Sequence, residues 1–319
     1  MPLEPLANGT NNGARPNWAP ILGQWDITEA SQKFRGEGQN FASGGDLFPV
    51  GLAVSNVAMQ NGMCRVKIRF SASFGKTVQA GGIVLGYRSP EHSYVFAQLG
   101  AARSAYSIGE HVVGFGWRPL VATGQLQNLR SDQDYVLQVN LSGQEIKILI
   151  DTVPVLQHLL SHPLEGRQVG LIAAGSQEVS FSDFAVWSGR PRAFVVMQFA
   201  EPYDTFYDEV IRKQADAAGF EVVRIDEKAG PGVIFQDIQH EIEQAEIVIA
   251  EITPANPNVF YELGYAHALG KPTILLAQRG SQLPFDIGSF RVVFYNDTIG
   301  GKAEVERNLK KHLEAISGR

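Results

Sequence analysis

Apolar and polar residues alternate with a period of two through much of the first 190 residues. In residues 66–70 (VKIRF) the three apolar side chains fall on one face of an extended strand and the two charged ones on the other. The same alternation runs through residues 135–141, turns at Ser142-Gly143 and returns through residues 146–150, which predicts a β-hairpin. Further short runs predict strands at residues 82–87, 94–99, 169–173 and 179–187. Many short strands without helical windows predict an antiparallel sandwich or jelly roll over residues 21–190.

The pattern changes after residues 188–191, a short turn-rich junction. The continuous apolar run at residues 193–199 predicts a strand that is covered on both faces, and from there strands alternate with amphipathic helices. The other predicted strands are 220–225, 246–252, 273–277 and 291–295, and the predicted helices are 203–218, 233–244, 259–269 and 304–316. The alternation predicts a three-layer, flavodoxin-like α/β domain with a parallel sheet over residues 191–319. Residues 1–20 lack periodicity and are rich in Asn, Gly and Pro, so we expect a disordered leader.

Composition and charge exclude several classes of protein. The 319 residues include one cysteine, Cys64, which excludes a disulfide framework or a multi-cysteine metal site and suits the reducing cytoplasm. No apolar run is long enough to span a membrane, and the first 20 residues lack the features of a signal peptide. The net charge of −6 falls wholly in residues 191–319, and no stretch clusters Lys or Arg, so we expect no binding to nucleic acid. The seven histidines lack the spacing of metal ligands, so we expect no metal.

Ligands of an open parallel sheet bind outside the carboxyl ends of its strands. The segments expected there contain neither a GxGxxG fingerprint nor a GxxxxGK[ST] loop, which excludes a hydride-transfer Rossmann enzyme and a P-loop NTPase. In residues 251–272, either Asn256 or Asn258 can cap a helix that carries Glu262 in its first or second turn, where the helix dipole favours an ionised carboxylate. A charged carboxylate between Tyr261 and Tyr265 suits the stabilisation of, or attack on, an oxocarbenium-like ribosyl centre. On composition alone, a solvated surface glutamate is the other interpretation.

Residues 256–272 (NPNVFYELGYAHALGKP) resemble the NPNVxYELGxAxxxGKP signature of the TIR-like and nucleoside 2-deoxyribosyltransferase-like superfamily. The resemblance covers about residues 193–317 and includes the end of the first strand and the loop at residues 283–286. It implies that Glu262 is the catalytic residue that cleaves an N-glycosidic bond, with Asn258 and Tyr261 beside it. Related sequences commonly have Asp at the position of Glu251.

Other side chains complete the predicted substrate site. Gln198 and Phe199 end the first strand, where an amide could hydrogen-bond to a base and a ring could stack on it, although structural packing is an equal alternative for Phe199. Asp226 ends the second strand and could accept hydrogen bonds from ribose hydroxyls or be an exposed turn carboxylate. Phe285 and Asp286 belong to the late loop that the resemblance implies. No cofactor is expected, because NAD or another nucleotide would be the substrate.

The amino-terminal half carries a second resemblance. Residues 170–172 and 179–186 are similar to the closing strand pair of concanavalin-like (laminin-G or glucanase-like) jelly rolls, which commonly bind glycans on a concave face. Tyr94, Tyr106 and Trp117 could stack on sugars or could belong to the core. No carboxylates have glycosidase spacing, so we expect this half to sense a ligand or to assist assembly.

Together these patterns favour a TIR-like N-glycosidase that acts on NAD or a related nucleotide through Glu262. The resemblance implies a role in bacterial stress or phage defence and a homo-oligomer whose cleft a neighbouring subunit completes. Two alternatives stay open. The domain could transfer the sugar to another base as a nucleoside 2-deoxyribosyltransferase, or it could be a nucleotide-binding or protein-interaction scaffold without turnover.

Overall fold

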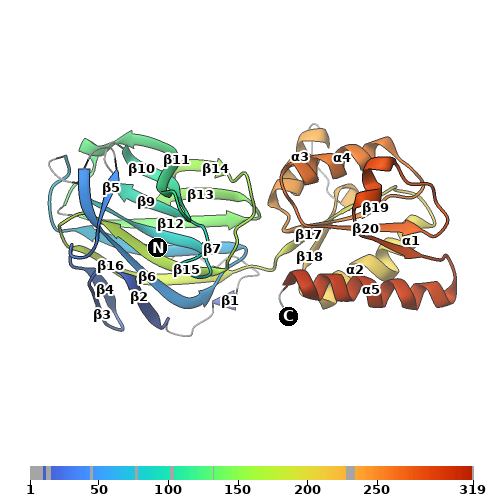
Figure 1. Cartoon of the computed structure of the whole chain (residues 1–319), viewed down its shortest axis with the longest axis horizontal. Coiled ribbons are helices and arrows are strands. Elements are labelled where there is room, and N and C mark those ends of the chain that lie inside the picture. The colour runs from blue at the N-terminus through green and yellow to red at the C-terminus, as the bar shows by residue number, and fades with distance from the viewer. Residues whose placement is uncertain are drawn as a thin grey trace. The chain divides into compact units, whose positions relative to one another are not determined.

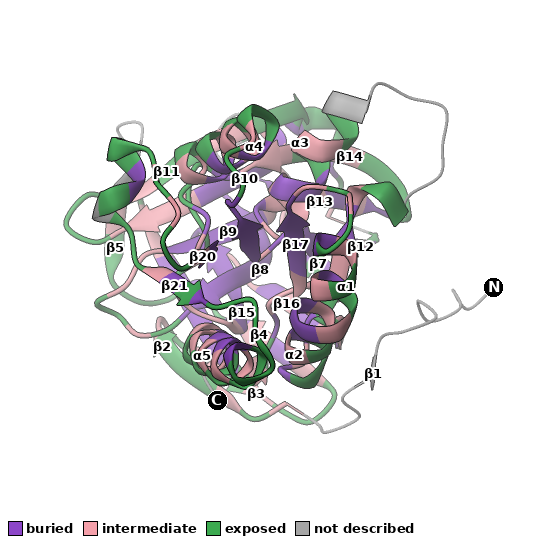
Figure 2. Cartoon of the chain, turned by 90° about the vertical axis from the view of Figure 1, so that its right-hand side faces the viewer, coloured by how far each residue is buried: buried purple, intermediate pink, exposed green. Residues whose placement is uncertain are grey.

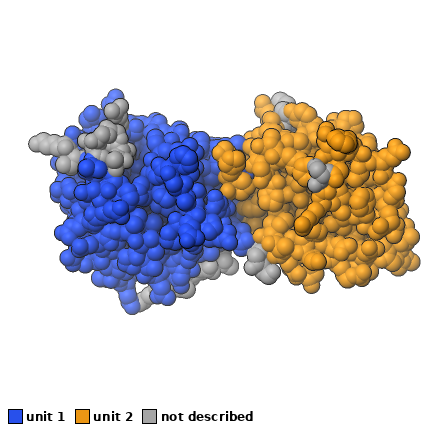
Figure 3. All heavy atoms as spheres, viewed as in Figure 1, with its two compact units in different colours: residues 1–160, 164–189 blue, residues 161–163, 190–319 orange. Residues whose placement is uncertain are grey.

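The computed structural model describes residues 10–11, 16–43, 46–75, 78–100, 104–131, 133–227 and 234–317. The chain divides into two compact units (Figure 3). They are Met1–Leu160 with Leu164–Gly189, and Ser161–Pro163 with Arg190–Arg319. Among the described residues, no helix is both long and apolar enough to cross a bilayer.

The first unit is a sandwich of two antiparallel sheets (Figure 1). One sheet has the order β14 (Val153–Leu159), β13 (Glu145–Ile150), β12 (Asp134–Ser142), β7 (Gly62–Phe70), β16 (Val179–Ser188), β4 (Ser31–Phe34) and β3 (Trp25–Ile27), with β1 (Thr10–Asn11) paired to β16. The other has the order β11 (Gly116–Gln125), β10 (Ser104–Val112), β9 (Tyr94–Gly100), β8 (Ala80–Tyr87), β15 (Gln168–Ala174), β6 (Asp46–Ala58) and β2 (Trp18–Leu22), with β5 (Asn40–Ser43) paired to β6. A 3-10 turn, η1 (Leu126–Asn128), precedes β12.

The alternation of the sequence explains this core. The predicted hairpin is confirmed, since β12 pairs with β13 and Leu141 lies opposite Ile146. The apolar members of both strands are buried between the sheets, as are those of β7. The sandwich begins before the expected residue 21, because Trp18 opens β2 and packs edge-on against Phe184 at 4.8 Å between ring centroids. Residues 1–9 and 12–15 of the expected leader lie outside the described residues.

The aromatic residues considered for sugar stacking pack within the sandwich. Tyr94 is 4% exposed and stacks on His111 at 4.8 Å, and Trp117 contacts the same histidine ring. These residues belong to a second apolar cluster on the other face of the sheet that contains β8, which explains why β8 is buried throughout. Tyr106 packs against the main core. This packing favours the structural interpretation of the three aromatic residues.

The second unit has a five-stranded parallel sheet with helices. Its order is β18 (Glu221–Arg224), β17 (Arg192–Val196), β19 (Ile247–Glu251), β20 (Thr273–Gln278) and β21 (Val292–Tyr295). The connecting elements are α1 (Tyr203–Phe206), the π-helical turn η2 (Tyr207–Ile211), α2 (Arg212–Ala217), η3 (Ile225–Glu227), α3 (Ile234–Gln244), α4 (Pro257–Ala268), η4 (Phe285–Ser289) and α5 (Ile299–Ser317). The expected parallel sheet with helices is therefore confirmed.

Alternate residues of β17 explain the layers of this unit. Ala193 and Val195 face the cluster formed with α2 and α5, whereas Phe194 and Val196 face the cluster formed with α3 and α4. Figure 2 shows the buried strands between helices whose outer surfaces are exposed. After β17 the chain adds β18 on one side of it and then crosses over to add β19 on the other side. The connections that follow β17 and β19 therefore run in opposite directions, which makes the gap between these strands a topological switch point. Such a point leaves a crevice for a ligand.

Candidate functional site

A cavity of about 420 Å³ opens at the switch point between β17 and β19. This volume lies in the range of small-molecule sites. The turn after β17, the short helix η3, the helix α3 and the first turns of α4 supply its walls. The lining residues are Met197, Gln198, Phe199, Ile225, Ile238, Asn256, Asn258, Val259, Tyr261 and Glu262.

The start of α4 fixes how Glu262 enters the cavity. Asn256 has an extended backbone, and its side-chain oxygen accepts a hydrogen bond of 2.9 Å from the backbone N–H of Asn258. Pro257 occupies the first helical position, where its missing N–H costs nothing. Asn256 is therefore the cap, which decides between the two predicted caps. Asn258 and Glu262 are four residues apart on the same helix face, and both line the cavity.

Glu262 is partly buried, and the lining of its cavity includes the apolar side chains of Met197, Ile238 and Val259. No described residue gives it a hydrogen bond or an ion pair, and burial raises its pKa to about 7. Burial therefore opposes the expected preference of the helix dipole for an ionised carboxylate. Glu262 lies in the second turn, where a dipole effect of about 0.3–1 kcal/mol has already weakened and desolvation dominates.

Glu251 links the ends of neighbouring strands. It closes β19 and is 2% exposed. Its Oε1 accepts hydrogen bonds from the hydroxyl and the backbone N–H of Thr253, whose Oγ1 accepts from the backbone N–H of Gln278 on β20. Burial raises the pKa of Glu251 to about 7, although the hydrogen bonds from Thr253 and the nearby hydroxyl of Tyr295 on β21 lower it in part. The cavity lining does not include Glu251.

The structure brings five of the predicted site residues together at the cavity: Gln198, Phe199, Asn258, Tyr261 and Glu262. Phe199 and Tyr261 are 48% and 60% exposed as whole residues. Sequence reasoning did not assign Met197, Ile225 or Ile238 to the site, because their apolar side chains follow the same pattern as the core.

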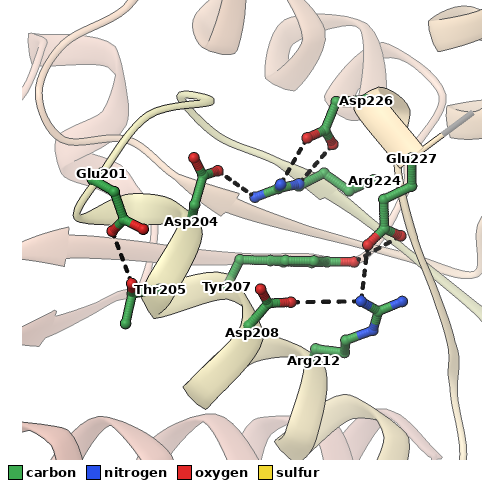
Figure 4. A network of polar contacts seen from close by, with 9 residues as sticks. All are labelled: Glu201, Asp204, Thr205, Tyr207, Asp208, Arg212, Arg224, Asp226 and Glu227. Carbon is green, nitrogen blue, oxygen red and sulfur yellow. Dashed lines mark hydrogen bonds and ion pairs between the residues drawn. The ribbon is translucent and has the colours of Figure 1, made fainter.

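Three predicted residues lie outside the cavity lining. Both carboxylate oxygens of Asp226 accept hydrogen bonds of 2.7 Å from Arg224 (Figure 4). Phe285 and Asp286 belong to η4, where Phe285 is 97% exposed. A ligand contact from these three residues stays a prediction. Among the described residues, no group of three or more His, Cys, Asp or Glu side chains is placed to hold a metal ion.

The last residues of the signature support the two helices at the site. Gly270 has a φ of +67° directly after α4, a left-handed conformation that glycine adopts readily. The buried Lys271 ammonium donates hydrogen bonds of 2.6 and 2.7 Å to the carbonyls of Glu243 and Ala245 at the end of α3. Burial lowers the pKa of Lys271 to about 8. The hydroxyl of Tyr265 on α4 also donates to the Glu243 carboxylate at 2.5 Å, which joins α4 to α3.

Comparison with known proteins matches the second unit to enzymes of glycosidic bonds. Residues 200–311, which include α4 and Glu262, match the family model described as nucleoside 2-deoxyribosyltransferase. The chain is 32% identical over 117 residues to the 5-hydroxymethyl-dUMP N-hydrolase of Rattus norvegicus, covering 34% of this chain and 69% of that protein.

Two solved structures are similar to different parts of the chain. The CMP N-glycosidase BcmB of Clostridium botulinum is 20% identical with a TM-score of 0.32, covering 38% of this chain and 98% of its own. The carbohydrate-binding module CBM66 from Bacillus subtilis is 16% identical with a TM-score of 0.43, covering 54% of this chain and 95% of its own.

Proposed function

Because the chain belongs to the nucleoside 2-deoxyribosyltransferase family, we propose that its second unit cleaves the N-glycosidic bond of a nucleotide through Glu262. The family and the matched relative are enzymes of glycosidic bonds, and this chain is one of them, a hydrolase or a transferase. The observation that carries the proposal is the carboxylate of Glu262 in the switch-point cavity, where no described side chain pairs with it. A carboxylate so placed is available to the substrate.

The chemistry follows from the charge that develops on the sugar. As the C1′–N bond breaks, its electron pair leaves with the base and positive charge develops at C1′. Ionised Glu262 stabilises this charge or attacks C1′, and the apolar walls strengthen the interaction because they exclude water. In hydrolysis a water molecule supplies the oxygen that bonds to C1′ and loses a proton. The base of a deoxynucleoside monophosphate leaves as an anion and takes up that proton, whereas nicotinamide leaves NAD as a neutral molecule and the proton goes to solvent.

Two aromatic rings and two amides serve substrate binding in this proposal. Phe199 and Tyr261 offer half-exposed faces on which a base stacks. Gln198 and Asn258 supply amide donors and acceptors for the base edge or the sugar hydroxyls. The polar groups lie beside apolar ones, which is typical of a site that orients a small ligand.

The substrate we propose is NAD or a related nucleotide. The TIR-like signature supports NAD, and the name of the rat relative, a 5-hydroxymethyl-dUMP N-hydrolase, supports a deoxynucleoside monophosphate. The purified full-length chain should be incubated separately with NAD, dUMP, 5-hydroxymethyl-dUMP and deoxynucleosides, and the released base measured by chromatography. Release that Glu262→Gln abolishes supports the proposal, whereas cleavage at the parent rate in that variant contradicts it.

Transfer of the sugar is the second candidate, and the description of the matched family favours it. In transfer, a second base takes the place of water at C1′. Adding free adenine to the same incubations distinguishes the two reactions. A transferase forms a new adenine nucleoside or nucleotide, and a hydrolase forms the free sugar, the sugar phosphate or, from NAD, ADP-ribose. Binding of nucleotide with no release of base by the parent chain would leave the scaffold alternative.

The remaining proposals concern the fold class of the second unit and the role of the sandwich. The strand order 2-1-3-4-5 supports a flavodoxin-like class for the second unit.

We propose that the sandwich senses a ligand, such as a glycan, or drives assembly of a cytoplasmic homo-oligomer. Light scattering alongside specific activity over a concentration series tests this role. A monomer whose specific activity stays constant would contradict the assembly role, and a specific activity that added glycans leave unchanged would contradict the sensing of a glycan.

A further inference from the structure

Arg224 lies directly behind one wall of the cavity. It is the last residue of β18, and its side chain is 9% exposed. Its guanidinium carbon is 5.4 Å from the centroid of the Phe199 ring and 4.2 Å from that of Tyr207. Phe199 lines the cavity, whereas Tyr207 is fully buried in the fold. The guanidinium thus connects the exposed ring of the site to a ring of the core.

Two carboxylates hold this guanidinium in place (Figure 4). Nε and Nη2 of Arg224 each donate a hydrogen bond of 2.7 Å to Asp226 on η3, and Nη1 donates one of 2.9 Å to Asp204 on α1. Burial alone would lower the pKa of Arg224, but these partners outweigh it and raise the pKa above its usual value. All three nitrogens are engaged with protein, so the group is fixed as a charged plane.

Phe199 needs such support. β17 ends at Val196, so Phe199 stands on the turn beyond the sheet and is 48% exposed. A side chain that is half in water keeps rotamer freedom, which a ligand must remove when it binds. A guanidinium against the ring attracts its π-face and restricts that freedom before the ligand arrives.

We propose that Arg224 is a positioning residue that fixes the ring of Phe199 as a wall of the cavity and so sets the affinity for the substrate base. The inference rests on the proposed function of the same cavity. Arg224 acts through Phe199 and touches neither α4 nor Glu262 in the described contacts. Its loss should therefore weaken substrate binding and leave the bond-breaking step largely intact.

Arg224→Lys tests the geometry, because lysine keeps the charge but lacks the planar fork that joins both aspartates and stacks on a ring. Arg212→Lys is the matched control. Arg212 lies 5.5 Å from the centroid of the same Tyr207 and pairs with Glu227 at 2.9 Å, away from Phe199. Figure 4 shows the two guanidinium groups on opposite sides of Tyr207.

The first measurement determines KM and kcat separately, with NAD or dUMP as the substrate, whichever of the two the parent chain cleaves. We expect Arg224→Lys to raise KM by about three- to tenfold with kcat within about twofold, and Arg212→Lys to change neither. Glu262→Gln should bind the nucleotide without cleaving it, so its dissociation constant can be measured directly. Adding Arg224→Lys to Glu262→Gln should raise this dissociation constant by the same factor as KM. Asp204→Asn removes one support of Arg224 and should act in the same direction with a smaller change, which covers the case of a poorly folded Arg224 variant.

A second measurement needs no ligand. With 4-fluorophenylalanine in the chain, the fluorine resonance that Phe199→Leu removes should shift in Arg224→Lys and stay in Arg212→Lys. An unshifted resonance, or an unchanged dissociation constant in Arg224→Lys and Asp204→Asn, overturns the positioning role while nucleotide cleavage by the parent chain still supports the proposed function. Failure of the parent chain and of Glu262→Gln to bind either nucleotide overturns both.

Discussion

Glu262→Gln should stabilise the folded protein above about pH 7 while it abolishes turnover. The folded carboxyl has a pKa of about 7 in place of the ordinary 4.5, because burial disfavours its charge. Between these values the unfolded chain releases the proton and the folded chain keeps it, so stability falls as pH rises through this window. The loss is complete above about pH 7. Glutamine has the same shape and does not ionise, so it avoids this loss.

The expected size follows from the same two values. The difference between a pKa of 4.5 and one of about 7 corresponds to about 3 kcal/mol that opposes the charged folded state. The cavity admits water to part of the side chain, so we expect a gain of about 1–2 kcal/mol in the free energy of unfolding at about pH 8. At about pH 4, where both states hold the proton, the variant and the parent should be equally stable.

Urea denaturation of the full-length chain measures this gain, and the sequence allows the two units to be followed separately. The described α-helices all lie in the second unit, so the far-ultraviolet helical signal reports on it. The four tryptophans, Trp18, Trp25, Trp117 and Trp187, all lie in the first unit, so their fluorescence reports on the sandwich. Only the helical transition should move.

The contributions of other titrating groups to the free energy of unfolding cancel when the variant is compared with the parent. Burial also raises the pKa of Glu246 and Glu251 to about 7, but these groups are the same in the variant and the parent. Glu209→Gln is a control of opposite sign, since hydrogen bonds from Lys213 and Lys302 lower the pKa of Glu209. A Glu262→Gln variant that is no more stable than the parent at about pH 8, or equally stabilised at about pH 4, would refute the reasoning.

Three further predictions follow from the site and from the unit boundary. Turnover should increase as pH rises through about 7, because Glu262 must be ionised to stabilise the sugar cation, and initial rates that peak near about pH 5 would contradict this role. Asn256→Ala should lower the free energy of unfolding of the second unit by about 1 kcal/mol, measured by urea denaturation, whereas Asn256→Ser should keep the cap and most of that stability. A fragment starting at Pro191 should unfold cooperatively with a mixed α/β circular dichroism spectrum, and an unfolded or insoluble fragment would count against the boundary.

The sequence predicts most strands and helices because each buries one face, so its apolar residues recur with the period of that element. β12 and β13 are recognisable from alternation alone, since one face of each strand lies in the core. The apolar run at residues 193–199 predicts one strand, yet β17 ends at Val196. Met197 and Phe199 leave the sheet to line the cavity. An apolar side chain suits a core strand and a ligand cavity equally well. The apolar pattern therefore does not show at which residue the strand ends and the cavity lining begins.

The charge states of the site depend on contacts that the sequence does not display. Asp226 at a strand end is consistent with a ligand contact, but Arg224 occupies both of its oxygens. Arg224 itself is buried because Phe199 and Tyr207 stack against it from separate segments. The pKa of Glu262 depends on its burial, which requires η3 and α3 as well as its own helix. Local spacing locates these groups but does not give their environment.

The recognisable signature and the proposed base-binding wall of the cavity belong to different segments. Within residues 256–272, Asn258, Tyr261 and Glu262 line the cavity, while Gly270 and Lys271 end α4 and hold the carboxyl end of α3. The signature thus places the carboxylate and the two helices beside it. Gln198 and Phe199 come from the turn after β17, which Arg224 supports from β18. Chains that share the signature can therefore differ at the proposed base-binding surface. We expect substitutions at Gln198 and Phe199 to change the choice of base while the reaction at C1′ stays the same.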